Sequence, residues 1–117
     1  MTTWHQTLRH EFEAGEGSFL IQLRPDLVWD RGAFSRMTEA MHACAVDLQR
    51  SDTRERWLAE LFWFLSSFVR EWSSHPNFPK PFEATYYEAA YRRLDDLAWW
   101  FFRGESPYAS GHIWKPL

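Results

Sequence analysis

The pattern of apolar and polar residues along the chain predicts four helices. The first covers about residues 3–14 and ends at Gly15 and Gly17, because glycines break a helix. A second is expected from Asp30, a suitable N-cap, to about residue 50. Projected onto a helix, its apolar residues share an arc of about 100°, which predicts one buried face. They are Phe34, Met37, Met41, Cys44, Ala45 and Leu48.

A third helix is expected over residues 53–73. Asp52 and Glu55 have the spacing of a capping box and predict its start. Its apolar arc spans about 160°, which is typical of a central helix that touches several neighbours.

The fourth helix follows a proline-rich break at residues 75–81. It begins between Pro81 and Thr85 and runs to Arg103, where Gly104 predicts its end. These four helices predict an all-α fold.

Two segments lie outside the helices. Residues 18–29 contain a short apolar run with no second strand to pair with, so we expect an extended segment laid over the core. The tail after residue 104 carries Tyr108, Ile113 and Trp114, and such apolar side chains predict that it docks. The sequence therefore predicts one all-α domain over residues 1–117, a bundle of about four helices with a docked C-terminal tail.

Composition excludes several classes of function. The chain has 13 basic and 16 acidic residues, without the basic excess that a nucleic-acid binder needs. Its longest apolar runs are far shorter than the roughly 20 residues that span a membrane. No secretory signal begins the chain, so we expect a cytoplasmic protein. Cys44 is the single cysteine and is expected to be a buried small hydrophobe.

Catalytic and metal-binding patterns are weak. Glu39 and His42 have the Glu-x-x-His spacing of di-iron bundles, but they project away from the apolar arc and lack a second copy. We therefore expect no metal and no cofactor. An alternative remains a small-molecule or metal-dependent helical enzyme whose site would lie between the helices. Its candidate residues are Tyr86, Tyr87, Tyr91 and His42 or His75.

Aromatic residues are unusually abundant, with 10 Phe, 8 Trp and 4 Tyr. Three tryptophans project onto the polar sides of the third and fourth helices: Trp63, Trp99 and Trp100. Arginines accompany them, and Trp and Arg are enriched at the energetic hot spots of interfaces. The candidate partner-binding residues are Trp63, Arg70, Trp99, Trp100 and Arg103. Trp29 and Asp30 join them if they form an exposed loop, although Asp30 is also explained as a helix cap.

Three hypotheses follow for the function. The first is a protein that binds another protein, of the inhibitor or immunity type by analogy of fold class. The second is a homodimer closed by the surplus aromatic residues, and the third is the enzyme above. One expectation weighs against the first hypothesis: the chain itself can cover the outlying tryptophans. The cover would come from the first helix, the Phe19–Leu23 segment and the tail.

Overall fold

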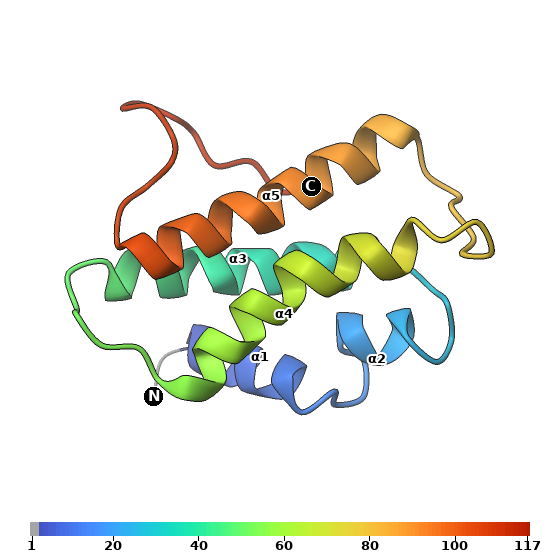
Figure 1. Cartoon of the computed structure of the whole chain (residues 1–117), viewed down its shortest axis with the longest axis horizontal. Helices are drawn as coiled ribbons and strands as arrows, with labels where there is room; N and C mark the ends of the chain where they lie inside the picture. Colours follow the sequence, from blue (N-terminus) through green and yellow to red (C-terminus); the bar gives the residue numbers. More distant parts are fainter. Residues whose placement is uncertain (1–2) are drawn as a thin grey trace.

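The chain folds into four long helices and one short helix (Figure 1). A computed structural model describes residues 3–117, and this part of the chain contains no strand. The helices are α1 (Thr3–Phe12), α2 (Phe19–Leu23), α3 (Arg31–Leu48), α4 (Arg56–Ser73) and α5 (Ala84–Arg103). The predicted all-α bundle is therefore confirmed.

α4 and α5 form an antiparallel pair. The rings of Phe62 and Phe101 stack inside the pair, with centroids 4.0 Å apart. Farther along, the hydroxyl of Tyr91 lies 2.7 Å from the Ser73 hydroxyl. α3 packs against both α1 and α5, so that the buried faces of the four long helices share one core.

Two helix ends follow the sequence closely. The side chain of Asp30 accepts a hydrogen bond from the Ala33 backbone N–H at 3.0 Å, so it caps α3 as predicted. Gly104 ends α5 with φ of +73°, a conformation that L side chains rarely adopt. A Cβ there would also lie 2.8 Å from the Gln49 carbonyl oxygen. The predicted capping box at the start of α4 is wrong, because Glu55 precedes the helix without a side-chain cap.

The prediction of an extended segment over residues 18–29 is wrong for its first part, which forms α2. The Ser18 hydroxyl accepts a hydrogen bond from the Ile21 N–H at 3.2 Å. The buried Glu11 carboxylate accepts two more, from the N–H groups of Phe19 (3.1 Å) and Leu20 (2.6 Å). The first three N–H groups of α2 are thus satisfied by side chains, which stabilises a helix too short to form alone.

The tail turns back along α5 after Gly104 (Figure 1). The Trp114 ring stacks on His42 of α3 with a centroid distance of 4.2 Å. The guanidinium carbon of Arg93 on α5 lies 4.0 Å from the same tryptophan ring. The predicted docking of the tail is therefore confirmed. No helix within residues 3–117 has both the length and the apolar character needed to cross a membrane.

Candidate functional site

Hydrogen bonds of the indole N–H groups separate seven of the eight tryptophans into two groups. The eighth, Trp114 in the tail, has a buried indole N–H without a partner in the described chain. Five of the seven donate to a partner inside the described chain: Trp4, Trp29, Trp57, Trp72 and Trp100. Trp63 and Trp99 donate to no acceptor within residues 3–117 and are 61% and 49% exposed. Buried tryptophans usually find a hydrogen-bond partner for the indole N–H. We therefore infer a structural role for the five bonded tryptophans and not for the exposed pair.

Trp29 and Trp100 belong to the core rather than to a binding surface. The Trp29 indole donates to the Tyr86 hydroxyl at 2.9 Å and is surrounded by other rings. Trp100 donates to the Gln49 side chain at 3.2 Å and meets the edge of the His42 ring. Helical projection placed Trp100 on the polar side of its helix because it takes no account of α3 and the tail, which cover that side.

Asp30 acts as a helix cap. Its carboxylate accepts hydrogen bonds from the Ala33 N–H and from the Gln22 side chain at 3.1 Å. The Ala33 hydrogen bond is the main cause that lowers the pKa of Asp30, with help from Gln22 and the charge of Arg36. Both oxygens therefore have internal partners, and with Trp29 buried the predicted Trp-Asp contact loop is not present at the surface.

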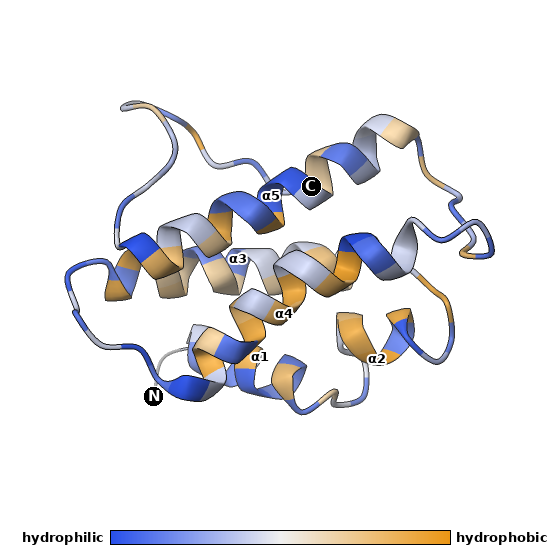
Figure 2. Cartoon of the chain, viewed as in Figure 1, coloured by the Kyte–Doolittle hydropathy of each residue, from blue (hydrophilic) through white to orange (hydrophobic). Residues whose placement is uncertain are grey.

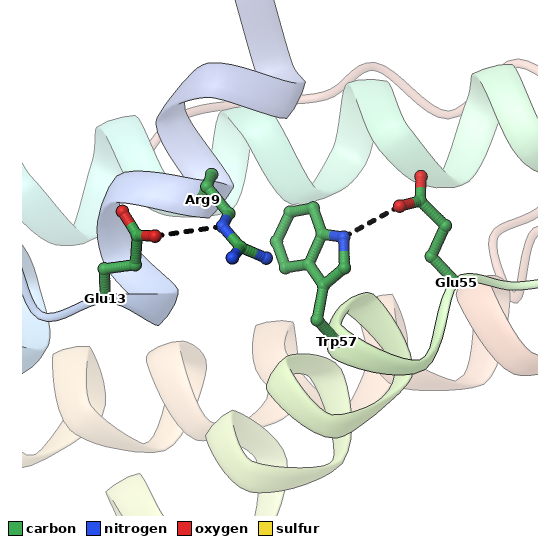
Figure 3. Close-up of polar contacts among 4 residues, drawn as sticks. All are labelled: Arg9, Glu13, Glu55 and Trp57. Atoms are coloured by element: carbon green, nitrogen blue, oxygen red, sulfur yellow. Dashed lines mark hydrogen bonds and ion pairs between the residues drawn. The ribbon is translucent and has the colours of Figure 1, made fainter.

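Trp57 at the start of α4 is held by contacts with neighbouring side chains (Figure 3). Its indole N–H donates to the Glu55 carboxylate at 2.8 Å. The Arg9 guanidinium from α1 lies 5.0 Å from the ring centre and pairs with Glu13 at 3.1 Å. This cluster joins the end of α1 to the start of α4, so Trp57 has a structural role.

The three most exposed aromatic residues, Trp63, Trp99 and Phe102, lie on the outer face of the α4–α5 pair. The Arg70–Asp95 ion pair, at 2.9 Å, marks that face. Trp63 precedes Arg70 by seven residues and Phe102 follows Asp95 by seven, which is two helical turns to within about 20°. Because the helices are antiparallel, both steps lead toward the same end of the pair. We call this surface the α4–α5 face; it comprises Trp63, Arg70, Asp95, Trp99, Phe102 and Arg103.

Within the α4–α5 face, the predicted arginines are engaged by neighbouring side chains. The Arg103 guanidinium carbon lies 4.6 Å from the Trp99 ring centre, a cation–π contact at the surface. Arg70 is ion-paired with Asp95 and also lies 5.4 Å from the Tyr91 ring. Phe102, 51% exposed, was not predicted. Its position three residues after Trp99, on the same side of the helix, was the signal available in the sequence.

A groove borders the α4–α5 face where α4 separates from α1 and α2. It encloses about 740 Å³. Its apolar walls come mainly from α2 and α4, whose apolar residues are visible in Figure 2. Trp63 lies at the groove and on the α4–α5 face, so the two surfaces are continuous. The lining residues are Glu11, Phe12, Ala14, Leu20, Ile21, Arg24, Pro25, Glu60, Leu61, Trp63, Phe64 and Trp72.

A second hollow of about 500 Å³ adjoins the groove through Trp72. Phe64, Phe68 and Trp72 stack in a row along α4, with ring centroids 4.6 and 5.5 Å apart. The Trp72 indole donates to the Leu23 carbonyl at 3.0 Å, which fastens α4 to the end of α2. The groove therefore has a fixed aromatic wall.

Residues considered for catalysis have other environments. Glu39 is exposed, and His42 stacks on Trp114. Tyr86 and Tyr87 are buried against Trp29. Among the described residues, no three His, Cys, Asp or Glu side chains come together as a metal site would require. Cys44 is fully buried, and burial raises the pKa of its thiol to about 12.

The within-chain covers expected for the outlying tryptophans act on only one of them. The tail and α3 cover Trp100, whereas Trp63 and Trp99 stay exposed beside Phe102.

Comparison of the chain with protein-family models, curated proteins and solved structures finds no significant match to any of them. The α4–α5 face and the adjoining groove are the candidate site.

Proposed function

We propose that this protein acts by binding another protein through the α4–α5 face and the adjoining groove. The observation that carries the proposal is the exposure of Trp63, Trp99 and Phe102 on one face, with both indole N–H groups unbonded within residues 3–117. Tryptophan is among the residues most enriched at energetic hot spots, and exposed apolar patches of this kind mark interaction sites.

The partner surface is defined by the chemistry of the face. Three large rings call for an apolar area on the partner, and the two indole N–H groups call for hydrogen-bond acceptors at its border. Arg103, already stacked on Trp99, offers further donors to a carboxylate or carbonyl group. An apolar helix or loop edged with acceptors satisfies both requirements.

The mode of action we propose is occlusion of a partner, as in an inhibitor or an immunity protein. Such a protein needs no chemistry of its own, because covering the partner's working surface is sufficient. α4 and α5 suit this role because they are long, packed helices, which present their side chains without the ordering cost of a flexible loop.

The proposal is tested by crosslinking at the face itself. A photoreactive phenylalanine analogue is placed at position 63 or at position 99 of the full chain, in the cells that make the protein. The matched control carries it at Val46, a residue of α3 that is 38% exposed and outside the face. Crosslinked products are then identified by mass spectrometry.

A protein that crosslinks at positions 63 and 99 but not at position 46 is then purified. It supports the proposal only if the same crosslinks form when it is mixed with the purified chain. We expect Trp63→Ala and Trp99→Ala to raise the dissociation constant of that pair about tenfold or more, while Val46→Ala changes it less than about twofold. Unchanged affinity in both tryptophan variants would overturn the proposal. A crosslinked product made of two copies of this chain would replace it with the homodimer hypothesis.

A further inference from the structure

The docked tail and α5 enclose a second kind of site, on a different part of the molecule from the α4–α5 face. A hollow of about 540 Å³ lies between them. Three of its lining side chains are basic (Arg93, His112 and Lys115) and none is acidic. Gly111, Ile113 and Leu117 complete the lining. In a chain with a net charge of −3 and only two lysines, this is a local concentration of positive charge.

Two hydrogen-bond donors at this junction have no partner. The Nη1 atom of Arg93 and the Nε1 atom of Trp114 are buried, and neither donates to any atom of the described chain. The two side chains are in contact, with the guanidinium carbon 4.0 Å from the ring. A buried donor without an acceptor is destabilising, and more so when it is charged.

No Asp or Glu side chain of the described chain forms an ion pair with the basic residues of the hollow. The three ion pairs within residues 3–117 involve other residues, and none of them includes Arg93 or Lys115. The charge of Asp96 on α5 acts on the Tyr108 hydroxyl, to which Arg93 also lies close. Burial and then Asp96 raise the pKa of Tyr108 to about 12, so this hydroxyl is a neutral donor at physiological pH.

We propose that the hollow between the tail and α5 binds an oxyanion, a carboxylate or phosphate group of a small ligand. The planar guanidinium of Arg93 matches the two oxygens of either group, and Lys115 adds a point charge from the tail. His112 contributes a ring N–H donor from the tail. An anion here offsets the positive charge of the hollow beside the two buried donors.

The site has consequences for the tail. Burial, followed by the charges of Arg93 and His112, lowers the pKa of His42, which stacks on Trp114. A bound anion weakens that repulsion, because it screens both neighbouring charges. Binding therefore tightens the contact of the tail with α3 and α5 and raises the pKa of His42 toward its usual value.

The test is a titration of the full-length protein, labelled with ¹⁵N, with inorganic phosphate and separately with acetate. Chloride at matched ionic strength and the same neutral pH serves as the reference. We expect saturable shifts at the Trp114 indole N–H and at the tail amides between residues 111 and 115. We also expect the lowered pKa of His42 to rise in the saturated protein.

Arg93→Gln and Lys115→Gln are the informative variants, and Arg92→Gln is the matched control. Arg92 is the exposed neighbour of Arg93 on α5, so its loss changes the net charge equally without touching the hollow. We expect Arg93→Gln to weaken binding about tenfold or more and Arg92→Gln to change it less than about twofold. Lys115→Gln keeps the Arg93–Trp114 contact and should weaken binding even if Arg93→Gln releases the tail.

Saturation by phosphate alone or by acetate alone assigns the chemistry of the ligand, and either supports the proposal. Shifts that rise linearly without saturation, or that chloride reproduces, would overturn it. Equal losses in Arg92→Gln and in both hollow variants would also overturn it, because they would show a response to overall charge. These results do not depend on the α4–α5 face, so this inference and the proposed function fail or succeed separately.

Discussion

Two aromatic regions of this molecule contain the same residue types and differ in how their polar groups are satisfied. In the first region, Trp29 is buried and its indole N–H donates to the Tyr86 hydroxyl. The rings packed around it are Phe19, Phe34, Tyr86 and Tyr87. On the α4–α5 face, the rings stand in solvent and the indoles of Trp63 and Trp99 have no acceptor within the described chain.

The difference shows that aromatic content by itself does not distinguish a core from an interface. In the Trp29 cluster, the apolar area and the hydrogen bonds are both complete within one chain, so the cluster stabilises the fold. On the face, both are incomplete, which leaves the same binding capacity available to a partner. Mutations in the Trp29 cluster should therefore lower the free energy of unfolding. Mutations on the α4–α5 face should weaken binding and leave that free energy nearly unchanged.

The largest loss of stability is expected for Trp29→Ala. Removing this ring opens a cavity against Phe19 and Phe34 and leaves Tyr86 without its hydrogen-bonded partner, which should lower the free energy of unfolding by about 3–5 kcal/mol. Urea denaturation followed by circular dichroism measures it. A loss below about 1 kcal/mol would contradict the structural role assigned to Trp29.

A smaller loss is expected for Glu11→Ala. The change leaves the N–H groups of Phe19 and Leu20 without acceptors in a buried setting, at a cost of about 2–3 kcal/mol. Glu11→Gln is the matched control, because it retains one acceptor oxygen and should cost less. Urea denaturation at neutral pH compares the two, and equal losses would show that the carboxylate does not cap α2.

Glu11 also gives the stability of the wild-type protein a predicted pH dependence. Burial raises the pKa of Glu11 above its usual value of 4.5, against the opposing effect of its two backbone hydrogen bonds. The native protein then holds this proton more tightly than the unfolded chain, so the associated stability is lost as pH rises from 4.5 through the native pKa. Glu11→Gln cannot titrate and should lack this slope in a series of urea midpoints.

α2 also shows where prediction from sequence ends. The four long helices were predicted because their apolar spacing and end residues, such as Asp30 and Gly104, are local signals. α2 was missed because its N–H groups are satisfied by Glu11, eight and nine residues earlier, and the spacing of apolar residues does not record such a contact. Trp100 was misplaced for a related reason, since only the assembled fold shows which side of α5 meets α3 and the tail.

The candidate site was predicted in part. Trp63 and Trp99 were identified because they break the apolar pattern of their helices, and the structure leaves both exposed. The groove was not predicted, because it depends on the distance between α4 and the α1–α2 segment. The orphan donors beside the tail were not predicted either, since unsatisfied groups appear only when the surrounding atoms are placed.

A modest change in stability with pH is expected at His42 of α3, where the tail packs. Burial, then the charges of Arg93 and His112, keep the pKa of His42 below its usual value of 6.5. The unfolded chain therefore takes up a proton before the native protein does, so stability falls as pH drops through 6.5 and levels off below the native pKa. His42→Phe keeps a ring against Trp114 and should remove this dependence in urea midpoints measured across that range. A slope that persists unchanged in the variant would assign it to other groups.

The smallest change in stability is expected at the α4–α5 face. Trp63→Ala removes a ring with no hydrogen bond inside the described chain and should alter the free energy of unfolding by less than about 0.5 kcal/mol. Trp99→Ala also loses the contact with Arg103, which is worth about 0.5–1 kcal/mol at an exposed site. Urea denaturation beside Trp29→Ala gives the comparison. A loss above about 2 kcal/mol in either variant would mean that the face stabilises the monomer, and the reason for assigning it to a partner would disappear. If both losses are small, the folded chain exposes two large rings that its own stability does not require, as the proposed interface with another protein predicts.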